Sequence, residues 1–144
     1  MRKGDPPAVE PRDLPALSRL KVVLIDDDVE IRESMRLLLE GWGCRYVAGA
    51  TLEEVEQRLR SERLTPDALI VDYRLAGTMS GLQVIEHLRA GFGSRLPALI
   101  ITGTANPSFL QSRATGIPFA IKPVAPGKLR AFLSQATMAR EEIA

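Results

Sequence analysis

Short apolar runs alternate along this chain with segments whose apolar residues recur every three or four positions. Five runs stand out, at residues 22–25, 44–48, 68–71, 97–101 and 117–121. Runs of this length that are rich in β-branched residues are typical of strands buried on both faces of a parallel sheet. The pattern therefore predicts five strands.

Between these strands, apolar residues recur at the three- to four-residue spacing of helices. Residues 29–40, 81–90 and the segment after Pro126 each place apolar residues on one face, which in the last segment are Leu129, Phe132, Leu133 and Ala136. Asp28 is expected to cap the first helix, and Thr51 with Glu54 forms the pattern of a capping box. A further helix after Asn106 is expected to be short and weakly apolar. This alternation predicts an α/β fold with a parallel sheet and helices on both faces.

Residues 1–19 differ from the rest of the chain. They contain four of the ten prolines and little apolar patterning. Such a composition is typical of a linker or flexible arm, although Leu14, Leu17 and Leu20 could dock on the domain. We therefore expect a linker at 1–19, one domain at 20–139 and a short tail at 140–144, which suits a module that can be attached to a larger protein.

Composition narrows the possible functions. The net charge is +1, so bulk charge gives no reason to expect a nucleic-acid or membrane partner. The longest apolar run, residues 96–101, is six residues long and contains a proline, which is too short to span a bilayer. Cys44 is the single cysteine, so no internal disulfide forms, and a cytoplasmic location is expected.

Each of four predicted strands ends in a polar residue of chemical interest. Asp26 and Asp27 follow the first strand, Asp72 the third, Thr102 the fourth and Lys122 the fifth. The carboxyl ends of parallel strands meet at one edge of the sheet, so these side chains should converge. Carboxylates suit a hard cation such as Mg²⁺, while a hydroxyl and an ammonium suit a phosphoryl group. A carboxylate beside such a metal can act as a nucleophile and form an aspartyl phosphate.

The motifs that carry these residues resemble those of the receiver domains of two-component response regulators. They are Val-Leu-Ile-Asp26-Asp27-Asp28, Ile-Val-Asp72-Tyr-Arg-Leu with Gly81 downstream, Ile-Thr102-Gly-Thr, and Phe119-Ala-Ile-Lys122-Pro123. They occur in the family's order and cover residues 20 to 138. The resemblance implies a doubly wound, flavodoxin-like sheet of five parallel strands in the order 2-1-3-4-5. The Pro-rich front and the Lys-Pro-Val ending are most like those of C-terminal receivers of hybrid sensor histidine kinases, and a stand-alone regulator stays open as the alternative.

The resemblance also implies a role for each residue at the sheet edge. Asp72 is the expected phospho-acceptor. Asp26 and Asp27 are expected to hold Mg²⁺ or Mn²⁺, together with Asp72 and the backbone carbonyl of Arg74. Lys122 is expected to pair with the acceptor or its phosphate. Thr102 and Phe119 occupy the switch positions, although Phe119 could equally be a simple core residue.

The partners follow from the same resemblance. The expected donor is a sensor histidine kinase or a histidine phosphotransfer domain, and a homodimer could form through the last two helices. The domain is not expected to be an enzyme, beyond its own phosphorylation and dephosphorylation.

Two other classes of function stay open at this point. A Mg²⁺-dependent phosphatase of the haloacid dehalogenase type also attacks with a strand-end aspartate, and Asp26 and Asp28 offer its Asp-x-Asp pattern. Glu30 stands where that family expects a small hydroxyl or apolar residue, and no acidic pair follows the fourth strand. A pseudo-receiver would act only as a protein-binding module. Such proteins have usually lost the acceptor or acidic residues, all of which are present here.

Overall fold

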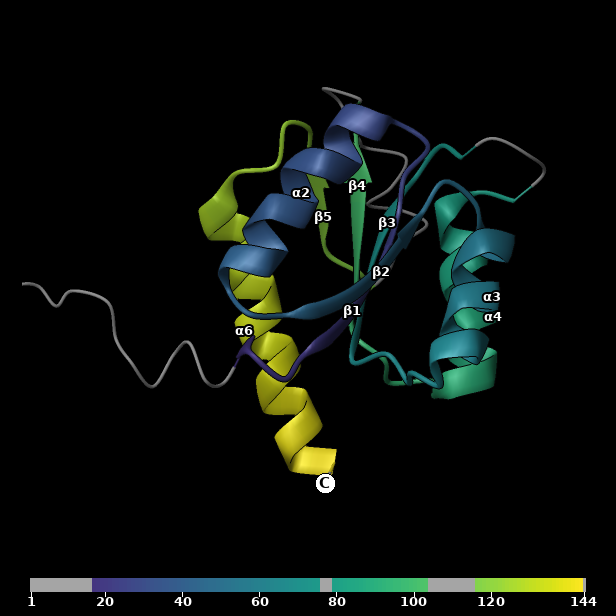
Figure 1. Ribbon diagram of the computed structural model, residues 1–144, viewed down its shortest axis with the longest axis vertical. Coiled ribbons are helices and arrows are strands. Elements are labelled where there is room, and N and C mark those ends of the chain that lie inside the picture. Colours follow the sequence, from purple (N-terminus) through teal and green to yellow (C-terminus); the bar gives the residue numbers. More distant parts are fainter. Residues whose placement is uncertain (1–16, 76–78, 104–115, 144) are drawn as a thin grey trace, which may run out of the picture.

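The five expected strands form one parallel sheet in the order β2-β1-β3-β4-β5 (Figure 1). The computed structural model describes residues 17–75, 79–103 and 116–143, with side chains through residue 139. The helix expected after Asn106 lies outside these residues. The order 2-1-3-4-5 and the flavodoxin-like fold are confirmed.

Each of the five strands differs from its predicted range by one or two residues at one or both ends, and the later starts of three of them have a physical reason. The strands are β1 (Lys21–Ile25), β2 (Arg45–Gly49), β3 (Ala68–Asp72), β4 (Ala98–Thr102) and β5 (Phe119–Ile121). Prolines explain two of the differences, because a proline has no N–H to donate to a sheet ladder. Pro97 and Pro118 only accept a bond, from Leu69 and Ile100 respectively, so the regular strands begin one residue later. The amide of Cys44 bonds to Leu39 at the end of the preceding helix, so β2 begins at Arg45.

Among the described residues, two helices cover each face of the sheet (Figure 1). They are α2 (Val29–Gly41), α3 (Leu52–Glu62), α4 (Gly81–Phe92) and α6 (Pro126–Ile143). The core beneath α2 and α6 contains Val22 and Leu24, and the core beneath α3 and α4 contains Val23 and Ile25. Successive residues of a strand point to opposite faces, so β1 contributes alternately to two cores. This explains why its sequence is apolar without interruption.

Residues ahead of β1 also contribute to the core. Leu17 and Leu20 are buried in the layer beneath α2 and α6, as is Cys44. Complete burial of a leucine is worth about 1.5–3 kcal/mol, so these contacts hold the start of the described chain against the domain. The docking of Leu17 and Leu20 is confirmed, and Leu14 lies outside the described residues.

The helix caps agree with the sequence in one case and differ in another. Asp28 caps α2, because its Oδ1 atom accepts from the amides of Glu30 at 2.9 Å and Ile31 at 3.3 Å. Thr51 Oγ1 accepts from the amide of Glu54 at 3.1 Å, but Glu54 Oε1 bonds to the amide of Ala50 at 2.7 Å. The expected capping box at Thr51 is therefore only half present, because Glu54 reaches one residue further back. A complete capping box, which the sequence analysis missed, opens α4 at Ser80 and Gln83.

Across the part of the chain that the structure describes, none of the helices combines the length and apolar character needed to cross a membrane.

Candidate phosphoryl-acceptor site

The register of the strands brings the predicted residues to one edge of the sheet. Ile25 of β1 pairs with Val71 of β3, so the next residues, Asp26 and Asp72, are neighbours. On the other side of β3, Thr102 of β4 pairs with Ile121 of β5, and Lys122 follows directly. The amide of Lys122 donates to the Thr102 carbonyl at 2.8 Å, which continues the ladder past the end of β5.

Three carboxylates gather at this edge. Asp26, Asp27 and Asp72 each offer one oxygen, and these three oxygens all lie within 4.8 Å of one another. Asp26 and Asp72 are 0% and 6% exposed, whereas Asp27 is exposed. Like charges this close repel by about 1 kcal/mol per pair in water and by about 4 kcal/mol at a partly buried site. A positive charge placed among these oxygens would therefore stabilise the cluster.

Lys122 supplies one such positive charge. Its Nζ atom lies 2.9 Å from Asp26 Oδ2 and 3.0 Å from Asp72 Oδ2, so one ammonium joins two carboxylates. One positive charge against three negative charges leaves the cluster short of cations.

The surroundings shift the pKa of the acceptor and of the lysine. Burial raises the pKa of Asp72, and the neighbouring Asp26 carboxylate raises it further, while the hydrogen bond from Lys122 opposes both. Burial by itself lowers the pKa of Lys122, but its bonds to Asp26 and Asp72 outweigh burial and raise the pKa. Lys122 is therefore a permanent ammonium at neutral pH.

The donor set fits a hard divalent cation. Asp26 Oδ2 is buried, and its charge partner among the described residues is the Lys122 ammonium, 2.9 Å away. A buried carboxylate oxygen of this kind is costly unless a charge partner satisfies it. Clustered carboxylate oxygens are the ligands that Mg²⁺ and Mn²⁺ prefer. Asp26, Asp27 and Asp72 would hold such an ion.

The other predicted residues are placed as follows. Thr102 is buried at the end of β4. The amide of Arg74 donates to Asp72 Oδ1 at 3.3 Å, and its side chain is exposed. Phe119 is half-buried, packs on the core beneath α3 and α4, and has Lys128 Nζ 6.0 Å from its ring centroid. The metal-binding role of the Arg74 carbonyl and the switch roles of Thr102 and Phe119 stay predictions.

Two further residues shape the site. Arg32 donates from Nη1 to the main-chain oxygen of Asp26 at 2.7 Å, and sequence reasoning missed this contact. The only feature of the sequence that could have indicated this contact is that Arg32 lies one helical turn after the Asp28 cap. Gly81 is placed so tightly that an added Cβ would lie 2.4 Å from the Asp72 carbonyl oxygen. A glycine is required there because any side chain would collide with the main chain of the acceptor.

Comparison with known proteins agrees with this fold and identifies the family. The family model of the response regulator receiver domain matches residues 22–134. The two-component response regulator PprB of Pseudomonas aeruginosa is 30% identical over 122 residues, which cover 81% of this chain and 43% of PprB. The phyllosphere-induced regulator PhyR of Methylorubrum extorquens is 26% identical over 125 residues, which cover 87% of this chain and 46% of PhyR.

Solved structures show the same fold. A response regulator receiver domain protein from Clostridium thermocellum superposes with a TM-score of 0.75 at 19% identity, over 88% of this chain and all of that one. The anti-anti-sigma factor PhyR from Bartonella quintana superposes with a TM-score of 0.72 at 23% identity, over 92% of this chain and 53% of that one.

The chain belongs to the response regulator receiver domain family of two-component systems. It spans less than half the length of PprB and of the Methylorubrum PhyR, two of the curated relatives that it matches.

Proposed function

We propose that this domain accepts a phosphoryl group from a phosphohistidine onto Asp72 and changes conformation as a result. The observation that carries the proposal is the pair of contacts that Lys122 makes with Asp26 and Asp72, within a cluster of three strand-end carboxylates. A sensor histidine kinase or a histidine phosphotransfer domain would be the donor. The cytoplasmic location stays part of this proposal.

The proposed step is a transfer between two nucleophiles. A carboxylate oxygen of Asp72 attacks the phosphorus, the phosphorus–nitrogen bond breaks, and the electron pair leaves with the imidazole, which keeps or takes up a proton. A Mg²⁺ ion bound by the carboxylates would neutralise charge on the phosphoryl oxygens. Lys122 then has a new partner, because the phosphoryl group brings three acceptor oxygens and about 1.5–2 negative charges.

The switch follows from the same electrostatics. A phosphoryl group on Asp72 attracts the Lys122 ammonium and the Thr102 hydroxyl, which both stand at the ends of neighbouring strands. Movement of these groups would reset the chain that follows β4 and β5 and so signal the modification. Dimerisation through the last two helices would be one output. Binding of another protein would be a second, as the name anti-anti-sigma factor suggests for the PhyR of Bartonella quintana.

The two alternative functions have less support. Asp28, which the Asp-x-Asp pattern of a phosphatase would need at the site, caps α2 through its side chain. The third and fourth strands bring no acidic pair to the cluster among the described residues. A pseudo-receiver would have no reason to keep three clustered carboxylates at a cost of several kcal/mol in repulsion.

The proposal is tested by direct labelling. The purified protein is incubated with Mg²⁺ and acetyl phosphate, and intact mass is measured. We expect a gain of one phosphoryl group, its loss in Asp72→Asn, and its retention in Asp28→Asn. Asparagine is as good a helix cap as aspartate, so Asp28→Asn is the matched control. Failure of the native protein to label, or continuous turnover of phosphomonoesters, would contradict the proposal.

A further inference from the structure

A guanidinium from the second turn of α2 reaches back to the main chain of the acidic loop. Arg32 Nη1 lies 2.7 Å from the carbonyl oxygen of Asp26, and the side chain is half-buried. The charge makes this donor stronger than a neutral amide, and its length is at the short end of the normal range.

The other hydrogen bonds that hold the loop after β1 are made by Asp26 and Asp28, not by the Asp27 side chain. The amide of Asp28 donates to Asp26 Oδ1 at 2.8 Å, and Asp28 Oδ1 caps the helix. The Asp27 side chain is exposed and, in the part of the chain that the structure describes, makes no hydrogen bond or ion pair. Its carboxylate therefore takes its direction from the backbone alone.

Arg32 is placed to fix that backbone. The Asp26 carbonyl and the Asp27 nitrogen belong to one planar peptide group, so a bond to the carbonyl oxygen orients the whole plane. The peptide plane sets the direction in which the Asp27 Cα, and with it the carboxylate, leaves the strand end. We propose that Arg32 is a positioning residue, which aims Asp27 at the divalent cation held with Asp26 and Asp72.

Charge and positioning predict opposite results when Arg32 is removed. A guanidinium close to a cation site repels the cation, so by electrostatics alone a neutral residue at position 32 would tighten Mg²⁺ binding. If Arg32 positions Asp27, its loss weakens Mg²⁺ binding despite the relief of repulsion. Partners that orient metal ligands typically contribute about 10–100-fold to metal affinity. We expect a loss of about tenfold, because repulsion offsets part of the effect.

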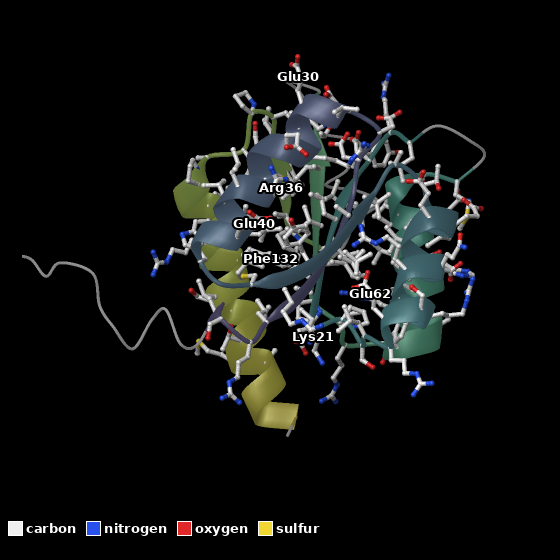
Figure 2. The ribbon with its side chains drawn as sticks, viewed as in Figure 1. Lys21, Glu30, Arg36, Glu40, Glu62 and Phe132 are labelled. Carbon is white, nitrogen blue, oxygen red and sulfur yellow. The ribbon has the colours of Figure 1, made fainter. Side chains whose placement is uncertain are left out.

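The inference rests on the proposed Mg²⁺ site, and the experiment separates the two. Mg²⁺ is titrated into the native protein, Arg32→Ala, Arg32→Lys and Arg36→Ala, and the dissociation constant is measured by calorimetry. Amide resonances of the metal-free proteins report the loop conformation at Asp27. Arg36 is the matched control, because it lies one turn further along α2 and pairs on the surface with Glu33 at 2.9 Å and with Glu40 at 2.8 Å. Figure 2 labels Arg36 and Glu40 on this helix.

We expect Arg32→Ala to raise the dissociation constant about tenfold and to shift the Asp27 amide resonance without Mg²⁺. Arg32→Lys should recover part of the affinity, since it keeps a charged donor, and Arg36→Ala should bind as the native protein does. Unchanged or tighter binding by a folded Arg32→Ala would overturn the inference while leaving phosphorylation of Asp72 intact. If the native protein bound no Mg²⁺, both this inference and the proposed function would be overturned.

Discussion

At the scale of single residues, Lys122 shows how the site is both stable and incomplete. Its ammonium lies within 3.0 Å of two carboxylates that would otherwise repel each other. Removal of one member of a buried ion pair leaves an uncompensated charge, which is far more costly than the pair itself is favourable. Lys122 thus supports the metal-free fold, and the same contacts place it beside the group that is proposed to be phosphorylated.

Cys44 provides a residue-scale test of the core. Burial raises the pKa of its thiol from 9.0 to about 11. The unfolded chain therefore loses the thiol proton at a lower pH than the folded protein, and stability falls as pH rises from about 9 to 11. Two pKa units correspond to about 2–3 kcal/mol at the upper end of this range.

The measurement is urea unfolding of the native protein and Cys44→Ala at pH 8 and at pH 10.5. The free energy of unfolding should fall more between pH 8 and pH 10.5 for the native protein than for Cys44→Ala. The advantage of the native protein in free energy of unfolding should therefore be smaller at pH 10.5 than at pH 8. Tyr46, whose pKa is also raised by burial and by its bond to Glu40, is present in both proteins and cancels. Parallel losses in the two proteins would show that the thiol is not protected as the structure indicates.

At the scale of elements, the junction of β3 and α4 couples the acceptor to a helix. The amide of Gly81 donates to the Tyr73 carbonyl at 2.8 Å, and a Cβ at position 81 would approach the Asp72 carbonyl oxygen to 2.4 Å. The helix can therefore begin against the strand end only because residue 81 has no side chain.

We expect Gly81→Ala to destabilise the fold by about 1–3 kcal/mol, because the helix or the strand end must move to admit a methyl group. The shift would also displace Asp72 and slow its labelling by acetyl phosphate. Gly91→Ala on the same helix is the control, since a Cβ there meets nothing within 4 Å. That change should stabilise the protein by about 0.5–1 kcal/mol. If Gly81→Ala and Gly91→Ala changed the free energy of unfolding in urea equally, the close packing of residue 81 against the Asp72 carbonyl would be contradicted.

At the scale of the whole molecule, the carboxylates of Asp26, Asp27 and Asp72, which are proposed to bind the cation, repel one another and so destabilise the cation-free fold. Three carboxylates share one lysine, so the protein without a divalent cation retains repulsion that a bound cation would remove. We expect Asp27→Asn to raise the free energy of unfolding by about 0.5–1 kcal/mol in the absence of divalent cations. The same variant should lose the rise in melting temperature that Mg²⁺ gives the native protein, since ligand binding stabilises the folded state.

Thermal unfolding with and without Mg²⁺ checks this expectation. Asp28→Asn is again the control, because it removes a charge from the same loop but outside the cluster and keeps the helix cap. It should show no gain in stability and a normal response to Mg²⁺. An Asp27→Asn variant that responds to Mg²⁺ as the native protein does would place the cation elsewhere.

The sequence by itself determined the alternation of strands and helices, the Asp28 cap and the set of residues at the strand ends. These depend on local chemistry: apolar runs must be buried, a short carboxylate satisfies free amides, and polar residues follow where a buried strand ends. The strand order, by contrast, came from resemblance to a family. Periodicity does not say which strands are neighbours, because any order buries the same apolar residues.

Only the tertiary structure decided which contacts complete the site. The register of β1 against β3 places Asp26 beside Asp72, and the path of α2 brings Arg32 to the Asp26 carbonyl. Gly81 is needed because a helix begins where a strand ends, and Lys122 joins two carboxylates that are far apart in the chain. These contacts join residues on different elements, so they depend on distances in space that a linear pattern does not contain.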